Sequence, residues 1–112
     1  MINFIKGGKE RSDSSLNALK YLKKYKPNNV FIHDAARPCL RSSDVQQLLT
    51  SIDGEVDGVV LGIPCSDTIK KVSAEGSLIL NTLDRSKLWR AFTPQIFRKE
   101  VLQKNALEEN IE

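Results

Sequence analysis

The sequence contains few of the residues that build metal cages, disulfide frameworks or aromatic binding surfaces. Its 112 residues include two cysteines and one histidine, and aromatic residues make up 6%. Cys39 and Cys65 form no Cys-x-x-Cys pair, and His33 is not spaced to complete a zinc site with them. We therefore expect both cysteines to be reduced packing residues, as in a cytosolic protein.

Long apolar runs and blocks of like charge are also missing. No segment approaches the roughly 20 apolar residues of a membrane span, and the N-terminus becomes polar too soon for a signal peptide. The net charge of +3 is spread along the chain, without the basic stripe and interleaved aromatics of a nucleic-acid binder. With 40% hydrophobic and 28% charged residues, the composition is that of one small globular domain.

Apolar residues recur with helical and strand periods in turn. Ser12 or Asp13 is expected to cap a helix that starts near residue 14, and a further helix is expected near residue 98. Ser43 and Gln46 predict a capping box at the start of another helix, which lies in sequence between those two helices. That middle helix connects two continuously apolar segments, 30–32 and 58–63. The order strand, helix, strand predicts an α/β fold, a partial Rossmann-like parallel or mixed sheet with helices on both faces.

A β-hairpin is predicted next, because segments 68–72 and 78–81 flank a turn that contains Gly76. A hairpin of this size is marginal by itself in water, so we expect it to protrude and to pack on something else. Trp89, which follows it, is expected in the core. Tyr21 and Tyr25 are expected to cover the flank of the first helix.

The sharpest chemical feature is the segment His-Asp-Ala-Ala-Arg-Pro at residues 33–38, directly after an apolar strand. Ligands of open α/β sheets bind beyond the carboxyl ends of strands. Asp34 is therefore a candidate ligand for Mg²⁺, and Arg37 a candidate bidentate clamp for a phosphate. A plain loop is the alternative, with Asp34 capping a turn and Arg37 paired with a surface acid. His33 is expected to be a structural hydrogen-bonding residue rather than a base.

Segment 33–39 resembles the signature loop of the 2-C-methyl-D-erythritol 4-phosphate cytidylyltransferase family. Segment 7–14, Gly-Gly-Lys-Glu-Arg-Ser-Asp-Ser, resembles a second motif of that family, although many relatives carry an acid in place of Lys9. Further matches in order and spacing lie at residues 67–70, 82–85 and 88–95. The resemblance therefore covers essentially the whole chain from Gly7.

The resemblance implies a role for eight residues. Gly8 and Ser14 resemble the positions that contact cytosine, Ala35 a backbone contact to the nucleotide, and Asp34 the ligand of the catalytic Mg²⁺. Four side chains resemble the groups around the phosphorylated sugar alcohol: Arg37, Thr68, Arg85 and Thr93. Residues 68–85 resemble an arm that embraces the partner in a homodimer, so that Thr68 and Arg85 would serve the neighbour's site.

The implied reaction is transfer of CMP from CTP to 2-C-methyl-D-erythritol 4-phosphate in non-mevalonate isoprenoid biosynthesis, in the cytoplasm or in a plastid. The family's N-terminal glycine-rich triphosphate loop and its C-terminal part have no counterpart in residues 1–112. We therefore expect a single incomplete nucleotidyltransferase domain that is inactive alone. Two alternatives remain, a piece of a ribitol 5-phosphate cytidylyltransferase, which Ala36 and Cys39 disfavour, and a non-catalytic dimerisation module.

Overall fold

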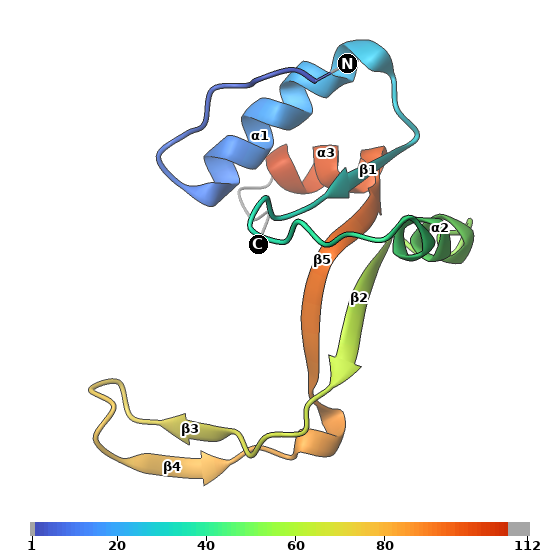
Figure 1. Ribbon diagram of the computed structural model, residues 1–112. Coiled ribbons are helices and arrows are strands. Elements are labelled where there is room, and N and C mark those ends of the chain that lie inside the picture. The colour runs from blue at the N-terminus through green and yellow to red at the C-terminus, as the bar shows by residue number, and fades with distance from the viewer. Residues whose placement is uncertain (1, 108–112) are drawn as a thin grey trace.

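The computed structural model describes residues 2–107, and the side chains among them through Lys104. These residues form three helices and five strands in the order α1-β1-α2-β2-β3-β4-β5-α3 (Figure 1). The helices are α1 (Arg11–Leu22), α2 (Ser42–Ser51) and α3 (Lys99–Leu107), with short 3-10 turns η1 (Lys23–Tyr25) and η2 (Arg85–Lys87). The strands are β1 (Asn29–Ile32), β2 (Gly58–Pro64), β3 (Lys70–Val72), β4 (Ile79–Thr82) and β5 (Trp89–Arg98).

The main sheet has the order β1-β5-β2, and β5 runs antiparallel to both neighbours. Strands β1 and β2 therefore point the same way, as predicted, but they do not pair with each other. The expectation of a parallel pair is corrected for a physical reason. The chain returns from the hairpin as one ten-residue strand, which pairs with both apolar strands and separates them. The α/β class is confirmed, and every strand pair among the described residues is antiparallel.

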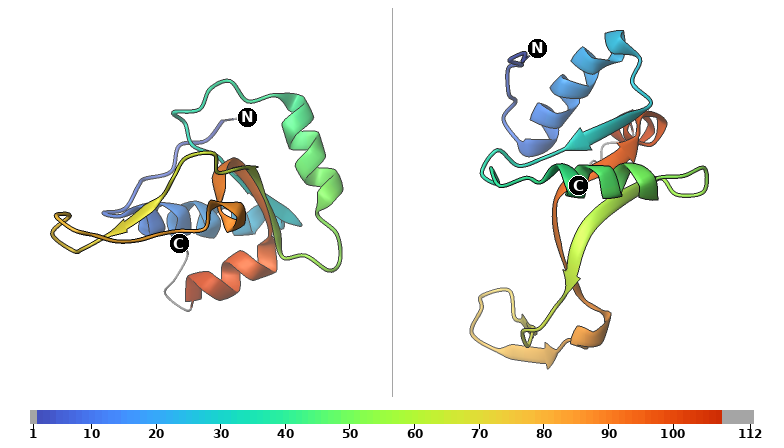
Figure 2. Two further views of the ribbon diagram at one scale, coloured as in Figure 1. Left: turned by 90° about the horizontal axis from the view of Figure 1, so that it is seen from below. Right: turned by 45° about the vertical axis from the view of Figure 1, so that its right-hand side comes forward.

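The buried core is small and draws one side chain from each of four elements. Among the described residues, the buried hydrophobic side chains are Val30 of β1, Leu48 of α2, Ile96 of β5 and Leu102 of α3. Helix α2 lies on one side of the sheet and α1 and α3 on the other (Figure 2). Helices on both faces were predicted, and both α2 and α3 contact β5.

Two helix starts differ from the predictions. Helix α1 begins at Arg11 after Glu10, and Asp13 Oδ2 accepts the Glu10 N–H at 3.2 Å from inside the first turn. Asp13 thus stabilises the helix start, but not from the position ahead of the helix. The predicted capping box in α2 is wrong, because Arg41 precedes that helix and makes no side-chain cap. The start of α3 agrees with the prediction to within one residue.

Strands β2 and β5 extend beyond the helices and lead to the β3–β4 hairpin at the far end of an elongated molecule (Figure 1). The hairpin forms as predicted, although β3 is shorter than its predicted segment and β4 is shifted by one residue. Gly76 adopts a φ of +76° in the turn, where a side chain would be strained. Every residue of β3 and β4 is exposed. The core position predicted for Trp89 is wrong, since 65% of its surface is exposed. It lies on the part of β5 that the helices do not cover.

The remaining predictions concern the cysteines and the tyrosines. Both thiols are free, but Cys39 is exposed, so its predicted packing role is wrong, while Cys65 is half-buried. Tyr21 and Tyr25 do lie together on one flank, with their hydroxyl oxygens 3.2 Å apart. No helix within residues 2–107 is both long enough and apolar enough to cross a bilayer.

Candidate functional site

The loop that follows β1 is anchored on β5 at a break in the sheet. Val60 of β2 pairs with Gln95, whereas the next residue, Leu61, pairs with Phe92. Thr93 and Pro94 are left without partners on β2, which makes a bulge. The backbone N–H of Asp34 donates to Thr93 Oγ1 at 3.1 Å. The bulge therefore fixes the point at which the loop leaves the sheet.

The loop folds back on itself immediately after this anchor. The Arg37 N–H donates to the Asp34 carbonyl at 3.0 Å, and His33 Nε2 lies 2.7 Å from the Arg37 carbonyl. A carbonyl can only accept, so Nε2 carries the hydrogen. This confirms a structural hydrogen bond for His33. The other ring nitrogen, Nδ1, is buried and has no partner among the described residues.

The Asp34 carboxylate lies between two arginines. Arg11 Nη2 is 3.3 Å from Oδ1, and Arg37 Nε is 3.4 Å from Oδ2. All three side chains reach solvent, with 39% of the Asp34 side chain exposed, 69% of Arg11 and 49% of Arg37. The Arg37 guanidinium also lies 5.3 Å from the ring centre of Phe92 on β5. Arg37 thus has an acidic partner, as the plain-loop alternative requires, but that partner is the candidate metal ligand.

Gly8 and Ser14 lie together at the start of α1. The Gly8 N–H donates to Ser14 Oγ at 2.9 Å. A Cβ at Gly8 would lie 2.1 Å from the Cβ of Asp13, so no side chain fits there. The Arg11–Asp34 contact joins this segment to the loop after β1, which turns toward the start of α1 (Figure 1). One region of the molecule therefore holds most of the predicted site residues, namely Gly8, Ser14, Asp34, Ala35, Arg37 and Thr93.

Thr68 and Arg85 are not part of this region. They flank the hairpin, which lies away from the loop after β1 (Figure 1). Arg85 Nη1 donates to the Ser66 carbonyl at 3.0 Å, across the base of the arm. Within one chain, the structure does not bring these two predicted residues to Asp34.

A divalent cation has one candidate protein ligand here. Among residues 2–104, no three histidine, cysteine, aspartate or glutamate side chains come together. Mg²⁺ is commonly held by one or two carboxylates plus substrate phosphates rather than by an all-protein cage. The single hard oxygen donor Asp34, half-exposed and flanked by two arginines, fits a cation that is shared with a phosphorylated substrate.

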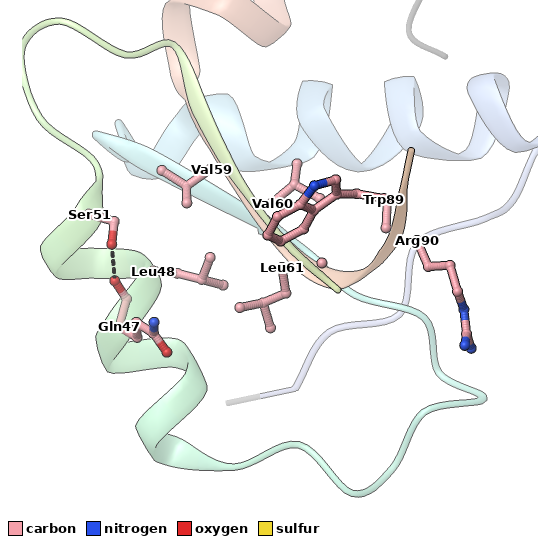
Figure 3. A pocket seen from close by; sticks show the side chains of 10 residues that line it. Gln47, Leu48, Ser51, Val59, Val60, Leu61, Trp89 and Arg90 are labelled. Atoms are coloured by element: carbon pink, nitrogen blue, oxygen red, sulfur yellow. Dashed lines mark hydrogen bonds between the residues drawn. The ribbon is translucent and has the colours of Figure 1, made fainter. Parts of the chain in front are cut away.

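A cavity lies elsewhere, between α2 and the β2–β5 ladder (Figure 3). It has a volume of about 340 Å³ and is lined mainly by apolar side chains, among them Leu48, Leu61 and Trp89. None of the predicted site residues lines it. The candidate site is thus the open surface around Asp34, not this cavity.

Sequence reasoning missed Arg11. It lies in a quoted motif between Gly8 and Ser14, yet received no role because 22 residues separate it from Asp34 in the chain. Only the packing of the start of α1 beside the loop after β1 reveals the contact. A single sequence carries no signal for such a pair.

Two sequence relatives align with most of this chain. A protein of Aliivibrio fischeri strain MJ11 named 2-C-methyl-D-erythritol 4-phosphate cytidylyltransferase is 46% identical over 99 residues, which are 88% of this chain and 41% of the relative. A protein of the same name from Alteromonas mediterranea is 42% identical over 111 residues, 98% of this chain and 45% of the relative. The chain therefore spans less than half the length of these curated relatives.

Solved structures agree with the fold. A crystal structure of 4-diphosphocytidyl-2C-methyl-D-erythritol synthase has a TM-score of 0.76 at 32% identity, covering 91% of this chain and 49% of that one. The Francisella tularensis 2-C-methyl-D-erythritol 4-phosphate cytidylyltransferase gives 0.77 at 29% identity, with 96% and 53% covered. The family model of 2-C-methyl-D-erythritol 4-phosphate cytidylyltransferase matches residues 1–112. The chain belongs to the 2-C-methyl-D-erythritol 4-phosphate cytidylyltransferase family.

Proposed function

We propose that this chain carries the metal, base and sugar-phosphate contacts of an enzyme that transfers CMP from CTP to 2-C-methyl-D-erythritol 4-phosphate. One observation supports this most strongly. Beside the end of β1, Asp34 and Arg37 lie within ion-pair distance and Thr93 anchors the Asp34 backbone. A carboxylate for a hard cation and a cation for a phosphate are what nucleotidyl transfer needs from a protein.

In this proposal each residue has one task. Asp34 holds Mg²⁺, which when bound neutralises charge on the phosphates of CTP. Ala35 offers its backbone to the nucleotide, and the segment with Gly8 and Ser14 faces cytosine. Arg37 and Thr93 orient the sugar phosphate, whose oxygen attacks the α-phosphorus of CTP and displaces pyrophosphate. Catalysis then comes from positioning and charge neutralisation rather than from a covalent intermediate.

The hairpin has its own place in the proposal. Arg85 and Thr68 lie far from Asp34 in the same chain, so they can complete a site only in a second copy (Figure 1). The apolar side chains of the arm are exposed, including Leu78, Ile79 and Leu80. A two-fold homodimer would cover such a patch and place each arm beside the partner's loop. We propose the cytoplasm, or a plastid in a eukaryote, as the compartment, in keeping with the free thiols.

The test is a chimera in which these 112 residues replace the matching segment of the Aliivibrio fischeri relative. We expect pyrophosphate release that requires CTP and 2-C-methyl-D-erythritol 4-phosphate and that ribitol 5-phosphate does not support. The 112-residue chain alone should show no turnover, because a cationic triphosphate loop is not among its residues. A chimera that folds but prefers ribitol 5-phosphate, or has no activity with either, would contradict the proposed substrate or the proposed catalytic role.

A further inference from the structure

Each oxygen of the Asp34 carboxylate faces a different arginine, and the two arginines come from different elements. Arg11 is the first residue of α1 and contacts Oδ1. Arg37 belongs to the same loop as Asp34 and contacts Oδ2. In this arrangement the carboxylate that is proposed to bind Mg²⁺ is already neutralised on both sides. A metal ion that binds Asp34 must share the carboxylate with these guanidinium groups or displace one of them.

Both ion pairs of Asp34 are weak enough to be replaced by other partners. At 3.3 and 3.4 Å they are longer than the 2.7–2.9 Å of strong charge-assisted bonds. The side chains are also largely exposed, and ion pairs of this kind contribute little to stability. By contrast, the backbone of Asp34 is fixed through Thr93 and the turn to Arg37. The guanidinium groups can therefore leave Asp34 without unfolding the loop.

A nucleotide gives the displaced arginine a new partner. The triphosphate is a denser anion than one carboxylate, and guanidinium groups bind phosphate oxygens bidentately. A bare cation, which offers no such partner, must compete with Arg11 and be repelled by it. The exchange is therefore more favourable when cation and nucleotide arrive together than when the cation arrives alone.

We infer that Arg11 is a second phosphate-binding cation, which stays on Asp34 until CTP arrives and so makes the site accept a divalent cation with the nucleotide rather than alone. This inference rests on the proposed function, because it takes Asp34 as the metal ligand and CTP as the substrate. It assigns Arg11 a binding and positioning role that neither its exposure nor its place in the sequence suggests.

The experiment measures two affinities on the 112-residue chain. Mn²⁺ binding is followed by electron paramagnetic resonance without nucleotide, and CTP binding by ¹⁵N chemical shifts of the Asp34 and Ala35 amides in the presence of EDTA. We expect Arg11→Gln to tighten Mn²⁺ about fivefold, because one repulsive charge near the ligand is gone. The same variant should weaken CTP roughly tenfold, through loss of a charge-assisted phosphate contact. If the substitution only damaged the fold, the chain would bind both Mn²⁺ and CTP more weakly.

Two further variants distinguish the effect of the charge of Arg11 from the effect of its position beside Asp34. Lys9→Gln removes one positive charge from the same exposed segment, and we expect it to change either affinity by less than about twofold, as for a screened surface charge. Arg11→Lys keeps the charge beside Asp34, so Mn²⁺ binding should stay as weak as in the parent. Similar effects of Arg11→Gln and Lys9→Gln, or equal gains in Mn²⁺ affinity in both Arg11 variants, would overturn the inference alone. A folded parent chain that binds neither Mn²⁺ nor CTP would overturn the proposed function with it.

Discussion

The two halves of β5 are parts of one strand in two different environments. Its C-terminal half lies between the helices, where Ile96 is fully buried, whereas its N-terminal half carries Trp89, with 65% of the residue's surface exposed. The bulge at Thr93 and Pro94 marks the change. Below the bulge, the ladder with β2 continues only as the stalk of the hairpin (Figure 1). The site loop is anchored where the buried half begins.

This difference separates the part that the chain buries by itself from the part that the proposed homodimer would cover. The buried half packs against α2 and α3 and carries the anchor of the Asp34 loop. The exposed half and the arm bury none of their large apolar side chains. A body with its own core can hold the loop in place in a single chain, whereas the arm has only its own ladder and would be stabilised by a second copy in the proposed homodimer.

The largest effect is expected at the site beside the buried half of β5. In the chimera described above, Asp34→Asn should lower kcat/KM on the order of 100- to 1000-fold, because a neutral amide is a poor ligand for a hard cation. Pyrophosphate release at saturating Mg²⁺ measures it. The matched control is Glu55→Gln, an exposed carboxylate in the loop before β2, which should keep the parental rate. Near-parental activity of Asp34→Asn would contradict the proposed role of Asp34 as a metal ligand.

The same substitution in the two environments compares their contributions to stability directly. Ile96→Ala empties a fully buried position and should lower the free energy of unfolding by about 2–5 kcal/mol. Ile79→Ala, on an arm strand where 65% of the residue's surface is exposed, should change it by roughly 0.5 kcal/mol or less in the monomer. Urea denaturation at low protein concentration measures both. Equal losses would show that the arm packs on the body in solution.

A charge on the arm tests whether a second copy covers it. Ile79→Asp should raise the dissociation constant of a homodimer by roughly tenfold or more, because burying an unpaired carboxylate is costly. Asn81→Asp places the same charge on the same strand, opposite Lys71, and should have a much smaller effect. Sedimentation equilibrium measures both constants. A parent chain that is monomeric at all concentrations tested, or equal effects of the two variants, would contradict the dimer arm.

Local patterns predicted the elements well, since strands, hairpin and helices follow from residues close in sequence. The motif at residues 33–38 likewise identified the loop beside the bulge. The periodicity of a single sequence could not indicate that β5 separates β1 from β2. A continuously apolar strand has the same pattern whether its neighbour in the sheet is parallel or antiparallel. The same limit explains Trp89. Its apolar ring indicates burial, but only the position of the helices shows that this part of β5 is uncovered.

The contact between Arg11 and Asp34 was beyond sequence reasoning for a related reason. It depends on how the start of α1 packs beside a loop 23 residues further on, and exposed charged residues carry no period. The prediction of the capping residues was wrong for a different reason. Ser43 has the right chemistry for a cap, yet the helix begins one residue earlier, at Ser42, and helix boundaries are the least reliable part of such predictions.

The smallest expected effect concerns how the base of the arm is held. Asp84 Oδ1 accepts the Ser86 hydroxyl at 2.6 Å and the Ser86 N–H at 3.1 Å, and these bonds, the hydroxyl first, lower the pKa of the Asp84 carboxyl. A carboxyl with a lowered folded-state pKa stabilises the fold above its ordinary pKa, and that contribution is lost as the pH falls through the folded-state value. Ser86→Ala removes the hydroxyl and keeps the N–H, so the pKa of Asp84 should rise part of the way to its ordinary value.

A carboxyl-detected NMR titration measures this shift, and Glu75 serves as an internal control. Its pKa is also lowered, first by a backbone N–H of its own residue and then by Ser77, and neither donor is altered by Ser86→Ala. If Asp84 titrates as before, the base of the arm is not held by this bond in solution. If Glu75 moves as far as Asp84, the substitution loosens the whole hairpin. In that case the arm would be a cooperative unit, and the contrast with the buried half of β5 would be weaker than the structure indicates.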